Sequence, residues 1–519
     1  MSKIKIHLLI PMSGEGIRFQ NYGYTIPKPL VPISGEPMIS RVLDNFPEHW
    51  ESHFVISENH AKTQLPSILK DLRKNCNISI IPPHKLGPSF AALEALKHIP
   101  VNEPVFVSYC DYGMIWDSSQ FERFIVDSSC EIALVSYRGF HAHYLTSQTY
   151  AYSKMSGELV DCVKEKGSFT DNRENEFASS GGYYFRSAGL LKECIDFQVS
   201  KNLSYNGEFY TSLTVQAYLQ QNPLAHVRVF EIPGFFQWGT PEDIVTFEYW
   251  EKTFRAYNRN QRQPIKYTEQ IIMPMAGKGS RFLESSKRPK PFIDIDGIPM
   301  YEKALQSLPQ AKKTNIIMLD EHKSYITHSN YNFTSLSETP NGQALSTEFG
   351  FLNVDMNKDV IVSSCDHAIV LDSQVWQEFQ KIKDCDAAIF TVKRYPGVAR
   401  TPHSYSYVII DNLAHPNNFP LVKGISLKAP TTENPLEEEL LVGTFWFKKC
   451  SLLKQGIEML KTSHFDLNKE LYLDSIFNVL IQNNYKVLSI PLDGYICWGD
   501  PQALKESQYW YEIFTCKKV

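Results

Sequence analysis

Short apolar runs alternate with amphipathic stretches along the first half of the chain. The apolar runs are rich in β-branched residues and have the length of buried strands: 6–11, 53–57, 78–81, 105–109 and 132–137. Residues 60–74 and 88–98 have helical spacing, and Pro88 directly after Gly87 suits the first turn of a helix. This alternation predicts an α/β layer with a largely parallel sheet, in which ligands bind beyond the carboxyl ends of the strands.

The second half of the chain repeats the first at an interval of about 262 residues. The end of an apolar strand, a glycine loop, Arg-Phe and a lysine between two prolines occur twice, as residues 10–29 and again as residues 273–291. Further along, Phe185 corresponds to Phe447 and Glu208 to Glu470. We therefore expect two tandem domains, 1–260 and 261–519, joined in the polar stretch 257–264.

Composition narrows the class of protein. A chain of 519 residues is long enough for two domains, and 43% hydrophobic with 21% charged residues is typical of a soluble globular protein. The net charge of −5 argues against nucleic acid as the main partner. The apolar N-terminal stretch is too short for a signal peptide, and no apolar run of about 18 residues predicts a membrane span. We therefore expect no membrane insertion. The ten cysteines lack Cys-x-x-Cys spacing, so we expect reduced thiols and a cytoplasmic location.

The duplicated glycine loop has the properties of a phosphate-binding element. A glycine-rich turn between a strand and a helix exposes backbone N–H groups to a pyrophosphate, and the helix start adds partial positive charge. The loop lacks the third glycine of a dinucleotide fingerprint and the Gly-Lys-Ser/Thr ending of a P-loop. An arginine two residues past the second glycine can donate to phosphate oxygens, and prolines restrain the backbone of the following lysine. This order of parts suits a triphosphate, although a glycine loop alone is equally an ordinary tight turn.

Three motifs, each present twice, carry a resemblance to a known family. Gly-x-Gly-x-Arg-Phe, Pro-Lys-Pro and Gly-x-Pro-Met together resemble the signature of the sugar-phosphate nucleotidyltransferases, also called nucleoside-diphosphate-sugar pyrophosphorylases. Trp238-Gly239-Thr240-Pro241 and Trp498-Gly499-Asp500-Pro501 resemble the closing segment of that family. The resemblance implies an α/β fold of two tandem Rossmann-like (GT-A-type) domains, each with a predominantly parallel mixed sheet flanked by helices.

The same resemblance implies an activity. Family members transfer a nucleoside monophosphate from a nucleoside triphosphate to a small phosphomonoester, such as a phosphorylated sugar or polyol, and release pyrophosphate. Mg²⁺ is the implied cofactor, because it is a hard cation that takes oxygen ligands. The usual role of such relatives is the synthesis of precursors for surface polysaccharides such as capsule or lipopolysaccharide.

The resemblance also implies roles for particular residues. The catalytic set is Arg18, Lys28, Asp111, Lys166, Arg281, Lys290, Asp366 and Lys428, of which Asp111 and Asp366 are the metal ligands. The nucleotide-binding set is Met12, Ser13, Gly14, Glu15, Gly16 and Gly87, with Met275, Ala276, Gly277, Lys278, Gly279 and Gly342 in the second copy. The acceptor-binding set is Glu165, Lys166, Gly181 and Lys428.

The second copy departs from the family pattern in its acceptor residues. Leu427 stands where the family has the carboxylate that Glu165 supplies in the first copy. The second copy could therefore serve a different acceptor or be inactive.

A second departure concerns the metal ligands before the closing segment. Gln237 and Cys497 occupy the place of a second metal-binding aspartate that many relatives have, and a thiol is a poor ligand for magnesium. Asp500 could substitute for that ligand, but its position before Pro501 favours a helix N-cap.

Three functions are compatible with these residues. The first is nucleotidyl transfer, the second is one active domain paired with a degenerate regulatory domain, and the third is a nucleotide-sugar-dependent glycosyltransferase. A glycosyltransferase would normally show Asp-x-Asp, which neither Cys110-Asp111-Tyr112 nor Cys365-Asp366-His367 supplies. The nucleotide base, the acceptor and the oligomeric state, including a homo-oligomer, stay open.

Overall fold

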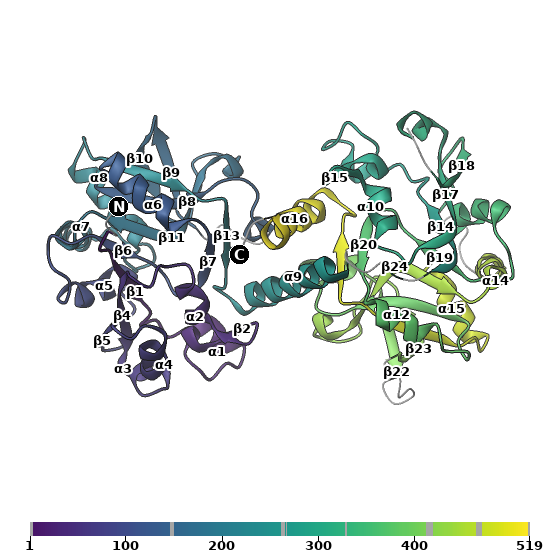
Figure 1. The fold of residues 1–519 in the computed structure, drawn as a ribbon, viewed down its shortest axis with the longest axis horizontal. Helices are drawn as coiled ribbons and strands as arrows, with labels where there is room; N and C mark the ends of the chain where they lie inside the picture. Colours follow the sequence, from purple (N-terminus) through teal and green to yellow (C-terminus); the bar gives the residue numbers. More distant parts are fainter. Residues whose placement is uncertain are drawn as a thin grey trace. The chain divides into compact units, whose positions relative to one another are not determined.

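The computed structural model describes residues 4–145, 150–260, 265, 267–326, 330–411, 419–462 and 470–516. The chain divides into two compact units, Met1–Glu248 (unit 1) and Tyr249–Cys516 (unit 2), and the division falls inside helix α9 (Pro241–Asn260) (Figure 1). The first four residues of the predicted junction, 257–260, form the last turn of α9, whereas 261–264 lie outside the described residues. Each unit has its own nine-stranded sheet.

Unit 1 is built around a mixed sheet. Its strands are β1 (His7–Pro11), β4 (Glu51–Ser57), β5 (Asn77–Ile81), β6 (Val105–Val107), β8 (Ile132–Tyr137), β9 (Tyr152–Ser156), β10 (Leu159–Lys164), β11 (Phe177–Phe185) and β12 (Val227–Glu231). They are ordered β5-β4-β1-β6-β11-β8-β12-β10-β9. The strands β5, β4, β1 and β6 run parallel to one another, whereas β11 is antiparallel to both β6 and β8. The glycine loop therefore follows a strand inside the parallel part, as the sequence pattern predicts.

Unit 2 repeats this topology strand for strand. Its strands are β14 (Thr268–Pro274), β17 (Ala311–Leu319), β18 (Asn332–Leu336), β19 (Val360–Ser363), β21 (Ala387–Val392), β22 (Tyr407–Asp411), β23 (Leu421–Ser426), β24 (Glu439–Phe447) and β25 (Val487–Pro491). Their order, β18-β17-β14-β19-β24-β21-β25-β23-β22, is the same permutation as in unit 1. The two units are thus tandem copies of one α/β fold, as predicted.

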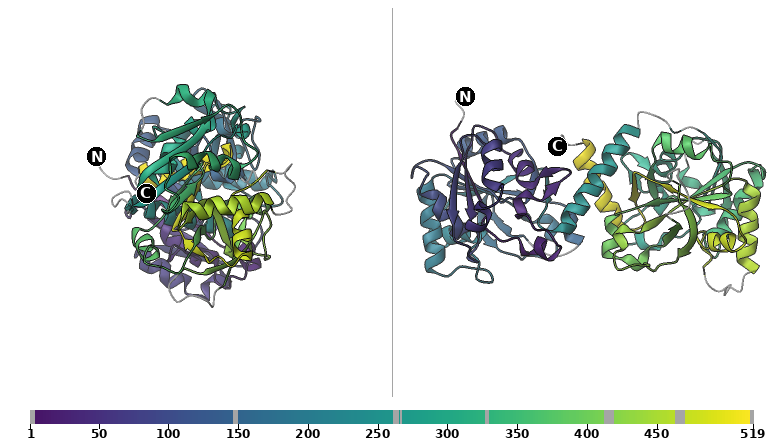
Figure 2. Two further views of the ribbon diagram at one scale, coloured as in Figure 1. Left: turned by 90° about the vertical axis from the view of Figure 1, so that its right-hand side faces the viewer. Right: turned by 90° about the horizontal axis from the view of Figure 1, so that it is seen from below.

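Helices cover both faces of the sheet in unit 1. One face packs against α5 (Pro88–Leu96), α7 (Ala188–Ser200) and α8 (Thr211–Gln221), which share one hydrophobic cluster with Val105 and Val107 of β6. The side chain between them, Phe106, points to the other face and packs against Trp50 and against Phe121 of α6 (Ser118–Ser128). This alternation follows from the two-residue period of a strand. Figure 2 gives two further views of these layers.

Unit 2 has the same two-sided core. Its helices α11 (Gln343–Glu348), α14 (Cys450–Thr462) and α15 (Ser475–Gln482) pack with Val360 and Val362 in one cluster. On the other face, Trp376 and Phe379 of α12 (Ser373–Phe379) pack against Phe390 and Trp446.

Shorter elements complete each unit. In unit 1 they are α1 (Ile17–Asn21), η1 (Lys28–Leu30), β2 (Pro32–Ile33), β3 (Glu36–Pro37), α2 (Met38–Leu43), α3 (Glu58–Ala61), α4 (Leu65–Leu72), β7 (Tyr112–Ile115), η2 (Ala142–Leu145), η3 (Arg173–Asn175) and β13 (Gly234–Gln237). In unit 2 they are η4 (Ser280–Phe282), η5 (Lys290–Phe292), β15 (Asp294–Ile295), β16 (Ile298–Pro299), α10 (Met300–Gln306), η6 (Asp320–Tyr325), η7 (Phe349–Asn353), β20 (His367–Val370), α13 (Pro396–Arg400), η8 (Pro402–Ser404), η9 (Pro435–Glu437), β26 (Gly494–Cys497), α16 (Pro501–Tyr511) and η10 (Glu512–Cys516).

Two sequence predictions need correction. The single helix predicted over 60–74 is wrong, because the segment forms α3 and α4 with a break between them. Pro66 lies in the first turn of α4, where a proline fits, and its ring is incompatible with a continuous helix through this point. The strand predicted over 105–109 ends at Val107.

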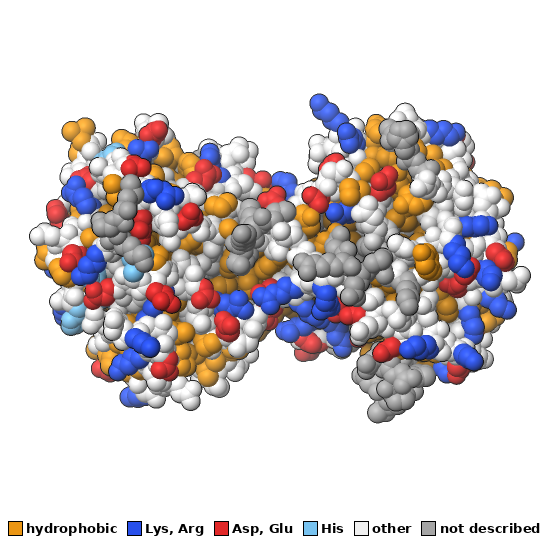
Figure 3. Space-filling view, viewed as in Figure 1, with side chains coloured by type: hydrophobic (Ala, Val, Ile, Leu, Met, Phe, Trp, Pro, Cys, Tyr) orange, Lys and Arg blue, Asp and Glu red, His pale blue; other side chains and the backbone are white. Residues whose placement is uncertain are grey.

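The surface charges and the helices concern two kinds of partner, nucleic acid and membrane. On the face of unit 1 seen at the left of Figure 3, Lys and Arg side chains are interspersed with Asp and Glu. Within the described parts of the chain, every helix is too short or too polar to cross a membrane.

Candidate active site

The glycine loop and the proline-flanked lysine pack directly against each other in both units. Gly16 has a left-handed backbone (φ 66°), and a Cβ at that position would lie 3.1 Å from Cβ of Lys28. Gly279 has the same conformation (φ 60°), and its Cβ would lie 2.7 Å from Cβ of Lys290. Glycine is therefore required here by both the backbone conformation and the close approach of the lysine.

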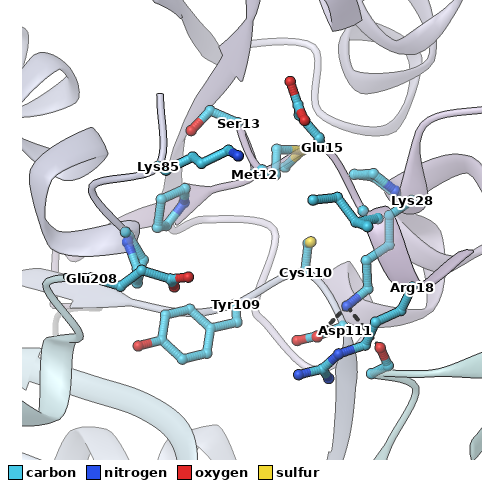
Figure 4. Close-up of a pocket in the computed structure, with 18 of the residues that line it drawn as sticks. Met12, Ser13, Glu15, Arg18, Lys28, Lys85, Tyr109, Cys110, Asp111 and Glu208 are labelled. Carbon is cyan, nitrogen blue, oxygen red and sulfur yellow. Dashed lines mark hydrogen bonds and ion pairs between the residues drawn. The ribbon is translucent and has the colours of Figure 1, made fainter. Parts of the chain in front are cut away.

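Each of these lysines forms an ion pair with the predicted metal-binding aspartate. Nζ of Lys28 lies 2.5 Å from Oδ2 of Asp111 and donates a hydrogen bond of 3.3 Å to the carbonyl of Gly239 (Figure 4). In unit 2, Nζ of Lys290 lies 2.6 Å from Oδ2 of Asp366 and 3.0 Å from the carbonyl of Gly499. The structure thus joins three segments that are far apart in the sequence. They are the proline-flanked lysine, the aspartate that follows β6 or β19, and the glycine of the closing segment.

Electrostatics hold the unit 2 pair in its charged form. Burial alone would raise the pKa of the Asp366 carboxyl, but Lys290 and His367 together outweigh burial and bring the pKa well below its usual range. Burial would lower the pKa of Lys290, but Asp366, together with Cys365 and Cys497, outweighs burial, so this pKa is raised. Because the pKa of Asp366 is depressed, the pair stabilises the fold above the unfolded-state pKa of about 4, and this contribution is lost as the pH falls below that value.

The Lys28–Asp111 pair lines a cavity of about 460 Å³. Its lining includes every residue predicted to bind the nucleotide in unit 1, namely Met12, Ser13, Gly14, Glu15, Gly16 and Gly87, together with Arg18, Lys28 and Asp111. Figure 4 shows Lys28 and Arg18 entering from one side, with Glu208 on the opposite side and Tyr109 between them. The chemistry of this lining, backbone N–H groups with cationic side chains, suits a triphosphate.

A second cavity, of about 630 Å³, is also lined by the pair. It is lined by the predicted acceptor residues Glu165, Lys166 and Gly181, and it shares Arg18, Lys28, Tyr109, Asp111, Glu208, Tyr210 and Gly239 with the first cavity. The lysine–aspartate pair therefore stands where two adjoining cavities meet.

The acceptor residues of unit 1 have defined partners. Glu165 accepts a hydrogen bond from the hydroxyl of Ser212, and burial raises the pKa of its carboxyl. Lys166 has a left-handed backbone (φ 52°) and donates a hydrogen bond of 3.1 Å to the hydroxyl of Tyr210. A left-handed conformation outside glycine is strained and is often found at functional sites. A Cβ at Gly181 (φ 92°) would lie 3.0 Å from the ring of Tyr109, so only glycine fits there.

Unit 2 has the corresponding cavity beside its glycine loop, with a volume of about 270 Å³. Predicted residues in its lining are Met275, Ala276, Gly277, Gly279, Lys290, Gly342 and Asp366. Among the described residues, the predicted Lys278, Arg281 and Lys428 do not line this cavity. Lys428 repeats the left-handed backbone of Lys166 (φ 51°) and donates a 3.3 Å hydrogen bond to Tyr472, whose hydroxyl donates to Glu470 at 2.7 Å.

The residues that replace the second family aspartate are occupied with other partners. The amide of Gln237 donates a 2.7 Å hydrogen bond to Asp243. Cys497 is buried, and burial raises the pKa of its thiol, which disfavours the thiolate. Asp500 accepts hydrogen bonds from the backbone N–H groups of Gln502 and Ala503, so the prediction that it caps a helix is confirmed.

Another group of metal-type side chains lies elsewhere in unit 1. Within the described residues, His7, Glu51 and His53 bring their ligand atoms within 4.8 Å of one another. His7 and Glu51 begin β1 and β4, whereas the glycine loop follows the end of β1. This group is therefore at the opposite edge of the sheet from the two cavities and does not contribute to them.

Sequence reasoning missed several residues that line both cavities. Tyr109, Glu208 and Tyr210 were not predicted as site residues, although Tyr210 pairs with Lys166. A signal was present in the chain, because Glu-x-Tyr recurs as Glu208 and Tyr210 in one copy and as Glu470 and Tyr472 in the other. Repeated polar residues at equal spacing would have identified the pair.

Comparison with known proteins places the chain in a family. The model of the MobA-like NTP transferase domain matches residues 8–170 and 271–418, which together make up more than half of the chain. The chain therefore belongs to the family of MobA-like NTP transferase domains, and the protein is a nucleotidyltransferase of the sugar-phosphate/NTP transferase type. No curated protein matches the chain.

Solved structures of single-domain size are similar to about half of the chain. A nucleoside-diphosphate-sugar pyrophosphorylase from Vibrio cholerae RC9 is 17% identical, covering 46% of this chain and 99% of its own, with a TM-score of 0.38. An inositol-1-phosphate CTP transferase from T. maritima is 12% identical, covering 47% and 97%, with a TM-score of 0.36. A UTP-bound UGPase from Acinetobacter baumannii is 14% identical, covering 47% and 94%, with a TM-score of 0.36.

Proposed function

We propose that the protein transfers a nucleoside monophosphate from a nucleoside triphosphate to a phosphorylated sugar, polyol or similar small phosphomonoester, and releases pyrophosphate. The observation that carries this proposal is that the ion pair of Lys28 and Asp111 lines two adjoining cavities. One cavity has a phosphate-binding loop, and the other has a lysine beside a carboxylate that can accept hydrogen bonds from hydroxyl groups. We further propose a cytoplasmic reaction that supplies precursors for surface polysaccharides.

The reaction joins two anions, so its chief requirement is charge neutralisation with alignment. A phosphate oxygen of the acceptor forms a bond to the α-phosphorus, while the bond from that phosphorus to the bridging oxygen breaks and pyrophosphate leaves. No proton transfer is needed for this balance. Lys28 would lie beside the α-phosphate, Arg18 would bind the triphosphate, and Lys166 would bind the acceptor phosphate. Alignment of this kind can lower a barrier by about 7–11 kcal/mol.

The donor set beside Lys28 fits a magnesium ion. Asp111 presents Oδ2 to Lys28, which leaves its Oδ1 as an oxygen ligand. Gly239 leaves room beside this carboxylate, because a Cβ there would lie 3.7 Å from Oδ2 of Asp111. Mg²⁺ is usually held by one or two carboxylates together with substrate phosphates. We therefore propose Asp111 and Asp366 as its protein ligands, where the bound ion would neutralise charge on the triphosphate.

A regulatory role for unit 2 is the competing proposal. Leu427 favours it, because this side chain removes the carboxylate that Glu165 supplies in unit 1. The retained Lys290–Asp366 pair favours catalysis instead, since its Nζ–Oδ2 distance of 2.6 Å is close to the 2.5 Å between Lys28 and Asp111. Variants of the two lysines separate the possibilities.

The test uses the full-length chain and measures pyrophosphate release with Mg²⁺, four nucleoside triphosphates and a panel of phosphomonoesters. Lys28→Ala should lower kcat/KM for unit 1 acceptors by about 100- to 1,000-fold, the usual effect of removing a group that stabilises a transition-state charge. The double variant Lys28→Ala/Lys290→Ala should release no pyrophosphate above background. Lys62→Ala is the matched control, because Lys62 lines neither cavity of unit 1.

Two outcomes would contradict parts of this proposal. Full activity in the double variant would remove both lysines from the reaction and with them the proposed function. If Lys290→Ala leaves turnover unchanged for every acceptor, unit 2 is regulatory rather than catalytic.

A further inference from the structure

The acceptor regions of the two units can be aligned contact by contact. In unit 1 the backbone N–H of Val163 donates to the side-chain oxygen of Gln216 at 2.7 Å, and in unit 2 that of Ile425 donates to Asn478 at 2.8 Å. The acceptor lysines donate to Tyr210 and to Tyr472 in the same way. These contacts fix the correspondence on both sides of Ser212, whose counterpart in unit 2 is Asp474.

Two facing positions carry different side chains in the two units, and the carboxylate is at one position in unit 1 and at the other in unit 2. In unit 1, Glu165 follows β10 and accepts a hydrogen bond from Ser212 at the start of α8. In unit 2, the position of Glu165 is Leu427 and the position of Ser212 is Asp474. Unit 2 has therefore kept a carboxylate in this region but carries it on the helix rather than on the strand turn.

The ordinary structural role of Asp474 would be to cap α15, and the structure does not show this role. Asp474 is the N-cap residue of α15, yet its side chain makes no capping hydrogen bond. Instead, Oδ2 accepts a 2.9 Å hydrogen bond from the hydroxyl of Ser406, and Oδ1 accepts one of 3.4 Å from the hydroxyl of Ser475. Ser406 precedes β22 and corresponds to Ala151, which lines the acceptor cavity of unit 1. The hydroxyl that orients Asp474 thus occupies the position that lines the acceptor cavity in unit 1.

The electrostatic surroundings of Asp474 also resemble those of Glu165. Burial raises the pKa of the Asp474 carboxyl, and the positive charge of Lys428 acts on it in the opposite direction. Glu165 is in the same situation in unit 1, where burial raises its pKa and Lys166 opposes the rise. Each unit therefore pairs one half-buried carboxylate with one lysine held in a left-handed turn.

We propose that unit 2 contains its own acceptor site, in which Asp474 binds an acceptor hydroxyl and Lys428 binds the acceptor phosphate. This inference rests on the proposed nucleotidyl transfer and extends it to a second substrate. The carboxylate of unit 2 approaches the acceptor from α15, whereas that of unit 1 approaches from the turn after β10. Leu427 then faces the edge of the acceptor that Glu165 contacts in unit 1.

This arrangement defines the class of the second acceptor. It is a small phosphomonoester with a hydroxyl on the edge facing α15 and a carbon-bound hydrogen or methyl group on the edge facing Leu427, as in a deoxy sugar phosphate or a short polyol phosphate. A hydroxyl buried against Leu427 would lose its hydrogen bonds to water without replacement. The two units should therefore prefer different acceptors.

The test uses the full-length Lys28→Ala chain, in which unit 1 is silenced. Glucose 1-phosphate, 2-deoxyglucose 1-phosphate, myo-inositol 1-phosphate and glycerol 3-phosphate are the probes, each with four nucleoside triphosphates. At least one probe should release pyrophosphate. Asp474→Asn should then lower kcat/KM for that probe by about 10- to 100-fold, which is the range for a hydrogen bond to a charged group, mainly through the acceptor KM. The KM for the nucleotide should stay within about twofold.

Two further variants distinguish binding from a structural role. Asp474→Glu should recover part of the lost kcat/KM, since it keeps the charge. The exchange Leu427→Glu/Asp474→Ser, in the same silenced background, should shift the probe preference toward that of unit 1. Glu433→Gln is the control, because it removes one exposed carboxylate from unit 2 and should leave kcat/KM unchanged.

The failures of the two proposals can be told apart. Asp474→Asn with unchanged acceptor kcat/KM overturns the role of Asp474. If the parent chain is active but the Lys28→Ala chain releases no pyrophosphate with any of the four probes, the second acceptor site is overturned and the proposed function is kept. An inactive parent chain overturns the proposed function itself.

Discussion

Units 1 and 2 share one lysine–aspartate pair beside a glycine loop and differ in the residues around this pair. The strand order is identical, and the side chains of the lysine–aspartate pair are 17% and 29% exposed in unit 1 and 16% and 28% exposed in unit 2. Around this constant pair the surrounding residues differ: Tyr109 corresponds to Ser364, and Glu165 to Leu427. The comparison teaches that the groups proposed to handle the transferred phosphate are held fixed, while the groups that would contact the acceptor vary.

The largest expected effect concerns the glycines that precede α5 and α11. A Cβ at Gly87 would lie 2.7 Å from the backbone nitrogen of Phe209, and one at Gly342 would lie 2.4 Å from the backbone nitrogen of Leu471. Both glycines have positive φ, so alanine adds strain to a backbone clash. We expect each substitution to lower the free energy of unfolding by about 2–5 kcal/mol, with the larger loss for Gly342→Ala.

Urea unfolding of the full-length variants, followed by fluorescence, measures these losses. Gly207→Ala is the matched control, because Gly207 also has positive φ but a Cβ there meets nothing within 4 Å. Its cost should be about 1 kcal/mol, from backbone strain alone. Equal losses for Gly207→Ala and Gly87→Ala would show that the close approach to Phe209 does not constrain unit 1.

A smaller effect concerns acid stability, because unit 1 has histidine where unit 2 has an amide. His53 is 1% exposed, and burial, with smaller contributions from His7, His98 and Lys5, lowers its pKa to about 4. An unfolded histidine titrates near pH 6.5. Between these values the unfolded state binds the extra proton, so stability falls as the pH is lowered, by about 2 kcal/mol from pH 7.5 to pH 5. The corresponding residue, Asn315, cannot titrate.

His53→Asn gives unit 1 the residue found in unit 2. The variant should lose this part of the pH dependence, measured as the difference in the free energy of unfolding between pH 7.5 and pH 5. Peptide-resolved hydrogen exchange in β1 and β4 assigns the change to unit 1. An unaltered pH dependence in the variant would mean that other groups cause the acid sensitivity.

The smallest expected effect concerns the helix starts after the two closing segments. In unit 1 the hydroxyl of Thr240 accepts a hydrogen bond from the N–H of Asp243, and the Thr240 N–H donates to the Asp243 carboxylate at 2.8 Å. In unit 2 Asp500 caps α16. Asp500→Ala should lower the free energy of unfolding by about 1 kcal/mol.

Because Asp500 acts as a cap, pyrophosphate release by the Lys28→Ala chain should change less than twofold when Asp500→Ala is added. A large loss of turnover, with its Mg²⁺ dependence shifted, would instead make Asp500 a metal ligand. The paired variant Thr240→Ala, assayed for stability, shows whether the two caps contribute equally.

Local features of the chain follow from the amino-acid sequence alone. The duplication, the α/β alternation, the glycine loop and the proline-flanked lysine all depend on residues close together in sequence, so backbone chemistry is enough to reveal them. The prediction of one helix over 60–74 was wrong for a local reason as well. Pro66 fits only near the start of a helix, and hydrophobic periodicity does not show this requirement.

Other features belong to the tertiary structure. The contacts of Lys28 with Asp111, of Ser212 with Glu165 and of Ser406 with Asp474 join residues on different elements. The chain by itself determined that two glycine loops of phosphate-binding type exist and which residues carry the charge. Only the folded sheet decided which side chains face one another, because strand order and register, rather than spacing along the chain, set the distances between elements.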